Sequence, residues 1–312
     1  MPKLNFINFK DKILKQLIIL ILIILTIIPT FILGIPVNAK QTTPVVTSKP
    51  FNLYITGNTN YKYCFEVLNL VNKERTKRKL KPLKMAQTLL NLANQRAAET
   101  SIYWSHTPPC GKKYSINEYL DHHEMPYNKY IYVGENIAFG QVKQQNPNPK
   151  SVMKDWMNSG GHKANILSKN YSYIGVGCFE TSTGHLYWTQ SFCNYNKKIA
   201  KKQTNTINKT YKIKCISKYA KVKKQYSTYK IQKGQNKSLS LYVENSANEL
   251  KKYHKKTYIN PSSFSFKSSN SKIATVNKYG KVKGNNTGNC NVTATVKNTN
   301  YNYMFKIYVL NK

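Results

Sequence analysis

Three short segments of the chain combine histidine, glutamate and glycine in patterns that could do chemistry. One contains His106 after a serine, one contains Glu135 after a glycine, and one runs from Trp156 through Ser159 and two glycines to His162. Two neutral imidazoles and a carboxylate can ligate zinc and leave one position open for water. The same groups can act as general acid and base. We therefore take His106, Glu135 and His162 as candidate site residues and candidate metal ligands.

A nucleophile for hydrolysis is less evident. Ser105 is adjacent to His106, so in an extended loop their side chains point apart. Ser159 lies three residues before His162 and is the better candidate. The sequence contains neither a G-x-S-x-G elbow nor an H-E-x-x-H helix. Three interpretations stay open: a binding site, a polar cluster in which Glu135 orients two histidines, and a hydrolase.

Taken together, the segments resemble the CAP superfamily of SCP/allergen-type secreted domains, particularly its bacterial branch. The resemblance spans about residues 61–195 and rests on S-H-T, G-E-N-I-A, W-x-x-S-x-G-H-x-x-N-I-L and I-G-V-G-C, in that order. It implies a three-layer α-β-α sandwich with an open cleft lined by His106, Glu135 and His162. Many relatives carry a second glutamate where Ser159 stands here, which weakens the case for a tightly bound divalent metal such as zinc or calcium. The resemblance favours a binding module, with a hydrolase as the alternative.

The N-terminus has the pattern of an export signal. Basic residues precede an apolar run from Leu17 to Ile28, and Val37-Asn38-Ala39 places small residues where a signal peptidase cleaves. An uncleaved membrane anchor is the rival interpretation, because a helix from Leu17 to Val37 could just span a bilayer of about 30 Å. Both place the rest of the chain outside the membrane, as a secreted or cell-surface protein.

The six cysteines indicate disulfides. They are even in number, none forms a C-x-x-C pair, and exported chains oxidise their thiols. Pairing within domains is the economical choice, and the resemblance also implies a bridge from I-G-V-G-C to the later C-N-Y. The expected bridges are Cys64–Cys110, Cys178–Cys193 and Cys215–Cys290.

The net charge of +37 comes almost entirely from lysine. Arg75, Arg78 and Arg96 are the arginines, and without more of these planar forks the sequence argues against base-reading nucleic-acid binding. A lysine-rich coding bias explains the charge without function. The functional explanation is salt-sensitive adhesion to anionic cell-envelope polymers or a membrane surface. Another protein is a further possible partner.

Periodicity divides the chain into two folded parts. Helical spacing from Tyr61 to Ala97 and around Ser151–Met157 precedes a β-hairpin at 172–195. Beyond it, short β-rich runs resemble a bacterial Ig-like domain, notably S-S-N-S-K-I-A-T-V-N-K-Y-G-K-V-K-G; such domains usually act as spacers or adhesive modules. The predicted fold class is α+β, a CAP-type α-β-α sandwich followed by an all-β Ig-like sandwich. The predicted segments are a signal or anchor (1–39), a linker (40–60), a CAP-like domain (61–196), a linker (197–210) and an Ig-like domain (211–312).

Overall fold

The computed structural model describes residues 49–111, 132–141, 147–195, 198–245 and 256–311. The candidate leader lies outside this part. Within it, no helix has the length and apolar character needed to cross a membrane.

A six-stranded sheet forms the frame of the first domain. Its strands follow the order β3-β5-β4-β1-β6, and the short β2 pairs with β4. All neighbours are antiparallel except β2 and β4. β3 therefore lies at an edge of the sheet, with β5 as its neighbouring strand. The strands are β1 (Phe51–Asn60), β2 (Lys84–Met85), β3 (Val133–Gln141), β4 (Tyr173–Thr181), β5 (His185–Cys193) and β6 (Thr206–Cys215).

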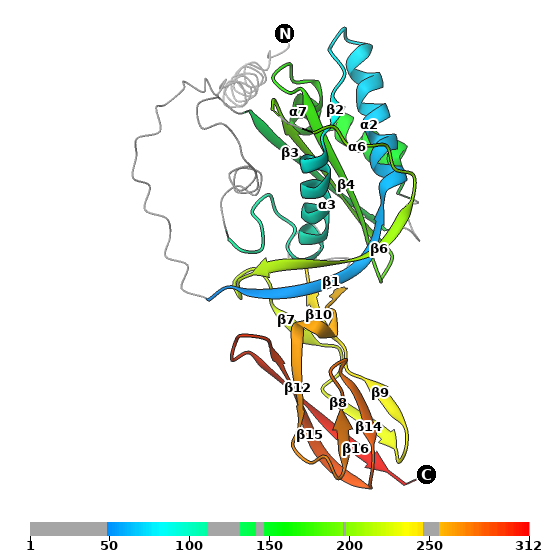
Figure 1. Ribbon diagram of the computed structural model, residues 1–312, viewed down its shortest axis with the longest axis vertical. Coiled ribbons are helices and arrows are strands. Elements are labelled where there is room, and N and C mark those ends of the chain that lie inside the picture. Colours follow the sequence, from blue (N-terminus) through cyan, green and yellow to red (C-terminus); the bar gives the residue numbers. More distant parts are fainter. Residues whose placement is uncertain (1–48, 112–131, 142–146, 196–197, 246–255, 312) are drawn as a thin grey trace, which may run out of the picture. The chain divides into compact units, whose positions relative to one another are not determined.

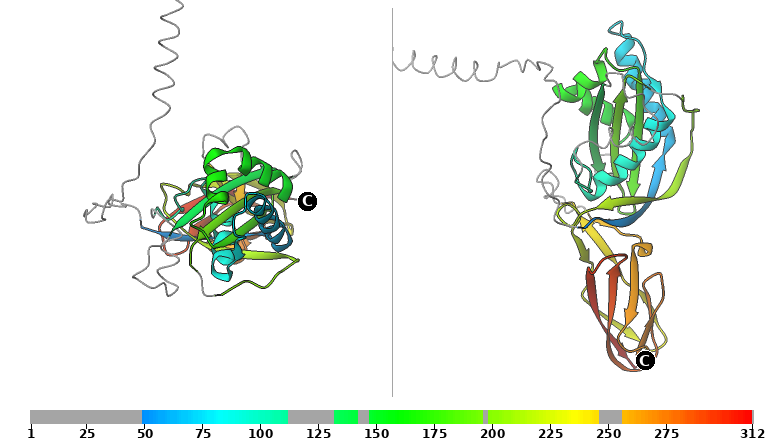
Figure 2. Two further views of the ribbon diagram at one scale, coloured as in Figure 1. Left: turned by 90° about the horizontal axis from the view of Figure 1, so that it is seen from above. Right: turned by 60° about the vertical axis from the view of Figure 1, so that its left-hand side comes forward.

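Helices cover both faces of this sheet (Figure 2), which confirms the predicted α+β class. α3 packs directly on β4, because Gly175 and Gly177 have no side chain to hold it away: a Cβ on either would overlap the α3 backbone. On the opposite face α2, α6 and α7 share a hydrophobic core with Val176 and Trp188. The helices are α2 (Tyr61–Thr76), α3 (Gln87–Ile102), α6 (Pro149–Asn158) and α7 (Gly160–Leu167).

Both segments predicted as linkers contain strands of this sheet. β1 lies inside the expected linker 40–60, and β6 begins inside the expected linker 197–210. The two strands pair over ten register positions, from Phe51↔Cys215 to Asn60↔Thr206, and run side by side in Figure 1. In β1, buried and half-buried residues alternate along its whole length. The alternation was not apparent in the sequence, because the second half of β1 consists of threonine, asparagine and glycine at buried and half-buried positions alike.

Local sequence explains where the helices beside the site begin. Asn148 caps α6, accepting hydrogen bonds from the N–H groups of Lys150 (2.9 Å) and Ser151 (3.1 Å), and Pro149 occupies the first turn. α7 follows directly, with Ser159 as its N-cap residue. Gly160 and Gly161 therefore belong to the first turn of a helix.

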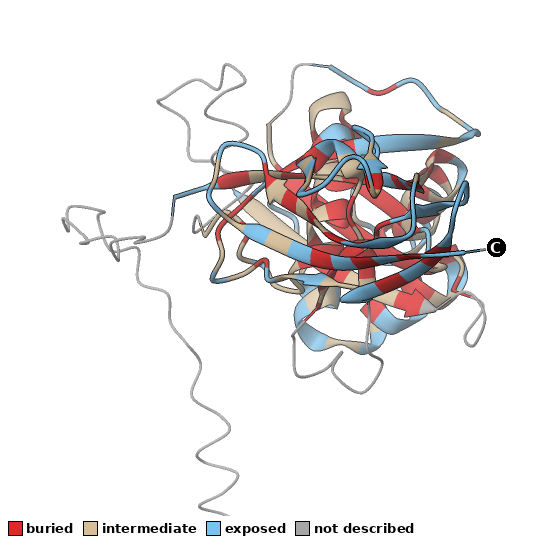
Figure 3. Cartoon of the chain, turned by 90° about the horizontal axis from the view of Figure 1, so that it is seen from below, coloured by how far each residue is buried: buried red, intermediate tan, exposed pale blue. Residues whose placement is uncertain are grey.

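The second part of the chain is built of strands, as the Ig-like resemblance implies. They form three small sheets in the orders β11-β10-β7, β12-β15-β16-β8 and β13-β14-β9, with β16 and β8 parallel. Alternate residues of the longer strands are buried (Figure 3). The strands are β7 (Val222–Lys224), β8 (Thr228–Gln232), β9 (Asn236–Ser238), β10 (Leu241–Glu244), β11 (Lys256–Tyr258), β12 (Phe264–Ser268), β13 (Ala274–Val276), β14 (Lys281–Gly284), β15 (Gly288–Val296) and β16 (Asn302–Leu310), with a 3-10 turn at Pro261–Ser263.

Residues of the strand-rich part bond the end of α3, just before the segment that carries His106. Asn245 Nδ2 donates to the carbonyl of Thr100 (2.8 Å), and Thr257 Oγ1 donates to that of Ser101 (2.8 Å). The N–H of Trp104 donates to Asn245 Oδ1 (3.1 Å). These bonds satisfy the last carbonyls of α3, which have no partner within the helix.

None of the three predicted disulfides is formed among the described residues. In the β4–β5 ladder, Cys178 lies opposite Trp188 and Cys193 lies opposite Tyr173. The two cysteines are thus five positions apart along the hairpin, about 17 Å, whereas bridged cysteines have Cα atoms within about 7 Å. The Cys178–Cys193 expectation is wrong because flanking one hairpin does not place two residues side by side.

The other cysteines also have different neighbours from those predicted. Cys64 Sγ donates to the carbonyl of Asn60 (3.2 Å) and lies 3.9 Å from Asn94 Oδ1, which accepts from the N–H of Cys178 (3.2 Å). Cys64 therefore lies beside Cys178 inside the helix–sheet core. Cys290 lies beside the Ser268 hydroxyl (3.9 Å) in the strand-rich part.

Candidate functional site

Glu135 is the centre of the candidate site. β3 places it on the α3 face of the sheet, where only 9% of its side chain is exposed. Arg96 of α3 binds both oxygens of this carboxylate: Nε donates to Oε2 (2.9 Å) and Nη2 donates to Oε1 (3.1 Å). This two-pronged geometry is the strongest form of arginine–carboxylate pair. The carboxylate therefore meets a fully buried guanidinium.

His106 is the third member of the cluster and also contacts the Glu135 carboxylate. Its Nδ1 lies 3.0 Å from Glu135 Oε1, and the imidazole donates this hydrogen bond because an ionised carboxylate can only accept. The side chain of His106 is 61% exposed. The bond holds the ring by Nδ1 and leaves Nε2 as the nitrogen that a ligand can reach.

Arg96 also builds the segment that carries His106. Nη2 donates to the carbonyl of Ser105 (3.0 Å) and lies 3.5 Å from that of His106, while Nη1 donates to Glu99 Oε2 (2.7 Å). One buried side chain thus holds a carboxylate, a helix neighbour and a loop backbone together. Arg96 positions both predicted residues, although it lies outside the three motif segments.

Burial and pairing act in opposite directions on these groups. Burial on its own would raise the pKa of Glu135, but the charge of Arg96 and the hydrogen bonds from His106 and Arg96 outweigh it, so the net pKa lies below its usual value. Burial would lower the pKa of Arg96, and the charges of Glu135 and Glu99 reverse this to a net rise. Both partners are therefore ionised at neutral pH.

His162 lies across the edge strand from this pair. Its carbonyl accepts from Asn136 Nδ2 (3.0 Å), and Asn136 neighbours Glu135 in β3, where successive side chains point to opposite faces. Burial lowers the pKa of His162, with a smaller contribution from the charge of His106. His106 therefore exerts an electrostatic effect on His162, whereas of the two histidines only His106 forms a hydrogen bond with Glu135 in the described part of the chain.

An amide network fixes α7 against β3. Asn165 Nδ2 donates to Asn136 Oδ1 (2.8 Å) and to the carbonyl of Glu135 (3.3 Å), and Asn136 Nδ2 also donates to Gln190 Oε1 (2.9 Å). The asparagines of the G-E-N-I-A and H-x-x-N-I-L motifs thus bond each other. Their role is to align the two motifs, which the sequence did not reveal.

The donor set does not fit a metal centre. In the described part of the chain, no group of three or more His, Cys, Asp or Glu side chains is arranged to hold a metal ion. Both oxygens of Glu135 are bonded to Arg96, whose positive charge opposes a nearby cation. The proposed ligand set of His106, Glu135 and His162 is therefore not assembled here as three converging donors.

The candidate nucleophile makes no contact that would activate it. Ser159 lies between α6 and α7 as the cap residue of both, and among the described residues its hydroxyl forms no hydrogen bond with a histidine. Ser191, opposite Glu135 in the β3–β5 ladder, carries a hydroxyl with no recorded partner, but its side chain is fully buried. Ser105 Oγ accepts from the N–H of Thr107 (3.0 Å).

Arg96 left a partial signal in the sequence. Arg96 follows Leu89, Leu92 and Ala93 at helical spacing, so it lies on the buried face of α3. A buried arginine requires a carboxylate partner. This requirement could have identified Arg96, but not that Glu135 would be its partner.

Acid should weaken the fold through these groups. A glutamate with a lowered pKa stabilises the fold above its unfolded value, about 4.3, and this contribution disappears as pH falls through the folded pKa. The lowered pKa of His162 acts in the same direction, beginning at about pH 6.5. Urea denaturation at a series of pH values should show stability falling below about pH 6.5, with a further fall below about pH 4.3. Equal acid sensitivity of the parent and Glu135→Gln in the lower range would contradict the assignment to Glu135.

Family models match both parts of the chain. Residues 68–192 match the cysteine-rich secretory protein family (CAP), and residues 225–303 match the bacterial Ig-like domain, group 2. Both resemblances seen in the sequence are thereby confirmed.

Individual relatives cover less. The chain is 32% identical over 158 residues to the uncharacterized protein YkwD of Bacillus subtilis. The matched region covers 50% of this chain and 56% of YkwD. It is 28% identical over 130 residues to the uncharacterized membrane protein YlbC of the same species, covering 41% of this chain and 33% of YlbC. Among solved structures, an extracellular protein containing an SCP domain from Bacillus anthracis matches with 23% identity and a TM-score of 0.35, covering 44% of this chain and 41% of that one. The chain thus spans about half or less of the length of these proteins.

Proposed function

The chain carries a CAP domain followed by a bacterial Ig-like domain, and on this premise we propose that it is an extracellular binding module that holds an anionic polymer of the cell envelope without chemical turnover. The pairing of these two domains is consistent with an extracellular interaction module. The leader-like N-terminus supports export, and cleavage after residue 39 would release the chain from the membrane.

One observation carries the non-catalytic part of the proposal. Glu135 is ionised, nearly buried and bonded through both oxygens to Arg96. A carboxylate neutralised in this way is a weak base, because taking a proton would sacrifice its strongest interaction. The group that defines the motif therefore serves to hold His106 and β3 in place.

The charge of the chain supports the choice of an anionic partner. A net charge of +37 creates a long-range attraction for polyanions that falls with ionic strength. Lysines supply most of this charge as separate, hydrated point charges, which suit a flexible polymer of spaced negative groups.

Binding should therefore depend steeply on salt. The purified chain is expected to be retained on immobilised glycerol-phosphate wall polymer at about 0.1 M salt and released well before about 1 M, since the screening length falls from about 10 Å to about 3 Å over this range. Column retention along a salt gradient measures this, with a neutral glucan matrix as the control. Absent retention, or retention unchanged by salt, would defeat the proposal.

A hydrolase remains the second candidate because of one feature of the site. Glu135 orients His106 through Nδ1 and leaves Nε2 exposed, as a carboxylate does for a catalytic histidine. In the described part of the chain the His106 ring forms no hydrogen bond with a serine, threonine or cysteine side chain, so this candidate uses a water molecule activated by His106.

The two candidates differ in turnover. The binding proposal predicts that the parent chain shows no hydrolysis above the blank with peptide, ester and glycan substrates, and that His106→Ala and His162→Ala behave identically to it. Lys150→Ala, on the exposed surface of α6, is the matched control. A substrate turned over by the parent and the control, but at least about 100-fold more slowly by His106→Ala, would establish the hydrolase instead.

A further inference from the structure

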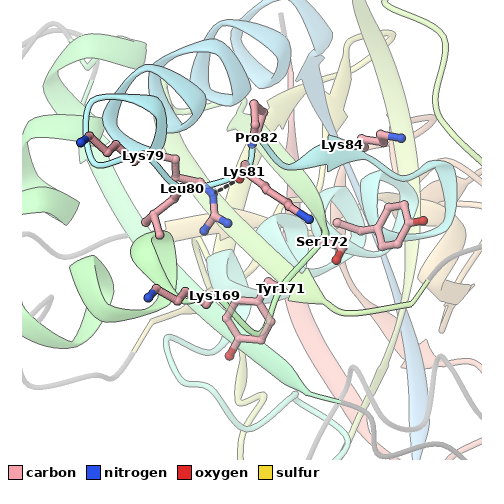
Figure 4. Close-up of a pocket in the computed structure, with 10 residues that line it drawn as sticks. Lys79, Leu80, Lys81, Pro82, Lys84, Lys169, Tyr171 and Ser172 are labelled. Atoms are coloured by element: carbon pink, nitrogen blue, oxygen red, sulfur yellow. Dashed lines mark hydrogen bonds between the residues drawn. The ribbon is translucent and has the colours of Figure 1, made fainter.

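A second candidate site lies away from the histidines. A pocket of about 530 Å³ opens between the end of α2 with its loop to β2 and the segment that leads into β4 (Figure 4). Small-molecule sites in proteins have volumes of about 300–1,000 Å³. His106, Glu135 and His162 do not line it. Its lining residues are Arg75, Lys79, Leu80, Lys81, Pro82, Lys84, Lys169, Tyr171, Ser172 and Tyr173.

The pocket concentrates positive charge beyond the average of this lysine-rich chain. Five of its ten lining residues are basic and none is acidic, whereas lysine and arginine make up 49 of the 312 residues of the chain. The nearby acid, Glu74, is already paired with Lys77 (3.1 Å) and Arg78 (2.7 Å), neither of which lines the pocket. No ion pair to a carboxylate is recorded for Lys79 or Lys81 within the described residues.

Arg75 builds the wall of the pocket. It is 1% exposed, and Nε donates to the carbonyl of Lys81 (2.9 Å), while Nη1 donates to those of Ile166 (2.8 Å) and Ser168 (2.8 Å). These bonds tie the lysine-bearing loop to the end of α7, close to Lys169 in sequence. The two sides that carry the lysines are therefore held at a fixed separation.

The facing wall is fixed to the strand that carries Glu135. The N–H of Lys84 donates to the carbonyl of Ser172 (3.1 Å), and the Tyr171 hydroxyl donates to the carbonyl of Val133 at the start of β3 (3.1 Å). The rings of Tyr171 and Phe192 stack at 5.3 Å. A site built on fixed backbone loses little entropy on binding a ligand.

We propose that this pocket binds a phosphate-bearing unit of the anionic polymer, so that the CAP domain contributes a defined binding site in addition to diffuse attraction. The inference rests on the proposed function and names where and how the polymer is held. Four lysines and Ser172 line one concave space. Their flexible side chains suit a compact group of more than one negative charge or a phosphodiester with its neighbours. The volume accommodates a phosphate with an attached polyol.

The test compares two triple variants of the full chain that lose the same charge. One removes pocket lysines, Lys79→Gln/Lys81→Gln/Lys169→Gln. The other removes exposed lysines elsewhere on the same domain, Lys150→Gln/Lys154→Gln/Lys212→Gln. Arg75 is left unchanged because it supports the fold. Calorimetric titration at about 0.1 M salt uses a glycerol-phosphate oligomer, with inorganic phosphate, phosphatidylglycerol vesicles and polyglutamate as comparison probes.

The pocket variant is expected to bind the glycerol-phosphate oligomer at least about tenfold more weakly than the parent, and the control variant within about twofold. Binding of the oligomer in preference to polyglutamate supports phosphate as the group recognised. If the pocket variant also loses binding of inorganic phosphate, a single phosphate group is sufficient for recognition. If it loses binding of the vesicles alone, the site recognises lipid headgroups and the polymer assignment is overturned.

Other outcomes separate the two proposals. Equal weakening in both triple variants would overturn the pocket while leaving salt-dependent polymer binding intact. No binding of the oligomer by the parent at low salt would overturn the proposed function itself. Thermal denaturation of both variants, with Tm values near that of the parent, verifies that a loss of binding does not reflect unfolding.

Discussion

Replacing Arg96 with methionine is expected to lower the free energy of unfolding by about 3–5 kcal/mol. The guanidinium is fully buried and its partner Glu135 is 9% exposed, so the variant leaves a carboxylate with little water and no counter-charge. It also removes the donor that holds the carbonyl of Ser105. Urea denaturation at neutral pH measures the change, and the loop carrying His106 should become more accessible to proteolysis.

The matched control is Arg78→Met. Arg78 forms an ion pair with Glu74 at 2.7 Å, but its side chain is 41% exposed, and exposed pairs contribute about 0–1 kcal/mol. The double variant Arg96→Met/Glu135→Gln should recover part of the loss, because it removes the unpaired charge. A similar loss for Arg96→Met and Arg78→Met would show that the buried pair is not the anchor inferred from its geometry.

Replacing Gly175 with alanine is expected to destabilise the CAP domain by about 3 kcal/mol or more. The new methyl group would overlap the backbone of Leu89 in α3, and a backbone cannot move aside as a flexible side chain can. The helix would have to lift from β4, which separates Arg96 from Glu135. Circular dichroism during thermal denaturation should show a lower Tm, and Gly175→Ala/Gly177→Ala should be more severe.

Gly161→Ala provides the control for this substitution. Gly161 lies in α7, where an added Cβ meets nothing within 4 Å. Alanine in an open helical position should raise stability by about 0.5–1 kcal/mol, because glycine loses more backbone entropy on folding. Destabilisation by Gly161→Ala comparable to that of Gly175→Ala would remove the steric explanation.

Several elements could be predicted because their signal is local. The apolar spacing of α2 and α3, the hairpin of β4 and β5 around Gly184 and the alternation in β15 and β16 depend on neighbours within a few residues. The four motifs together indicated the family. The S-H-T and G-E-N-I-A motifs indicated that His106 and Glu135 lie near each other, and their 3.0 Å hydrogen bond agrees.

The errors concern partners far apart in the sequence. β1 and the first half of β6 were predicted as linkers because both strands pair with distant partners: β1 with β4 and β6, and β6 with β1 across about 150 residues. The expected disulfides failed for the same reason: membership of a domain or a hairpin does not specify which thiols meet. Cys64 of α2 and Cys178 of β4 both contact Asn94, and they come together only when α2 packs on the sheet.

The sequence by itself determined the family, the two folded parts and the identity of the residues in the motifs. The tertiary structure decided what those residues do. It placed Arg96 under Glu135, put His162 across the edge strand, and gathered lysines from two separated loops around one pocket. Local propensity and periodicity are carried by the nearest neighbours, whereas charge pairing, strand register and the shape of a cavity depend on which distant segments pack together.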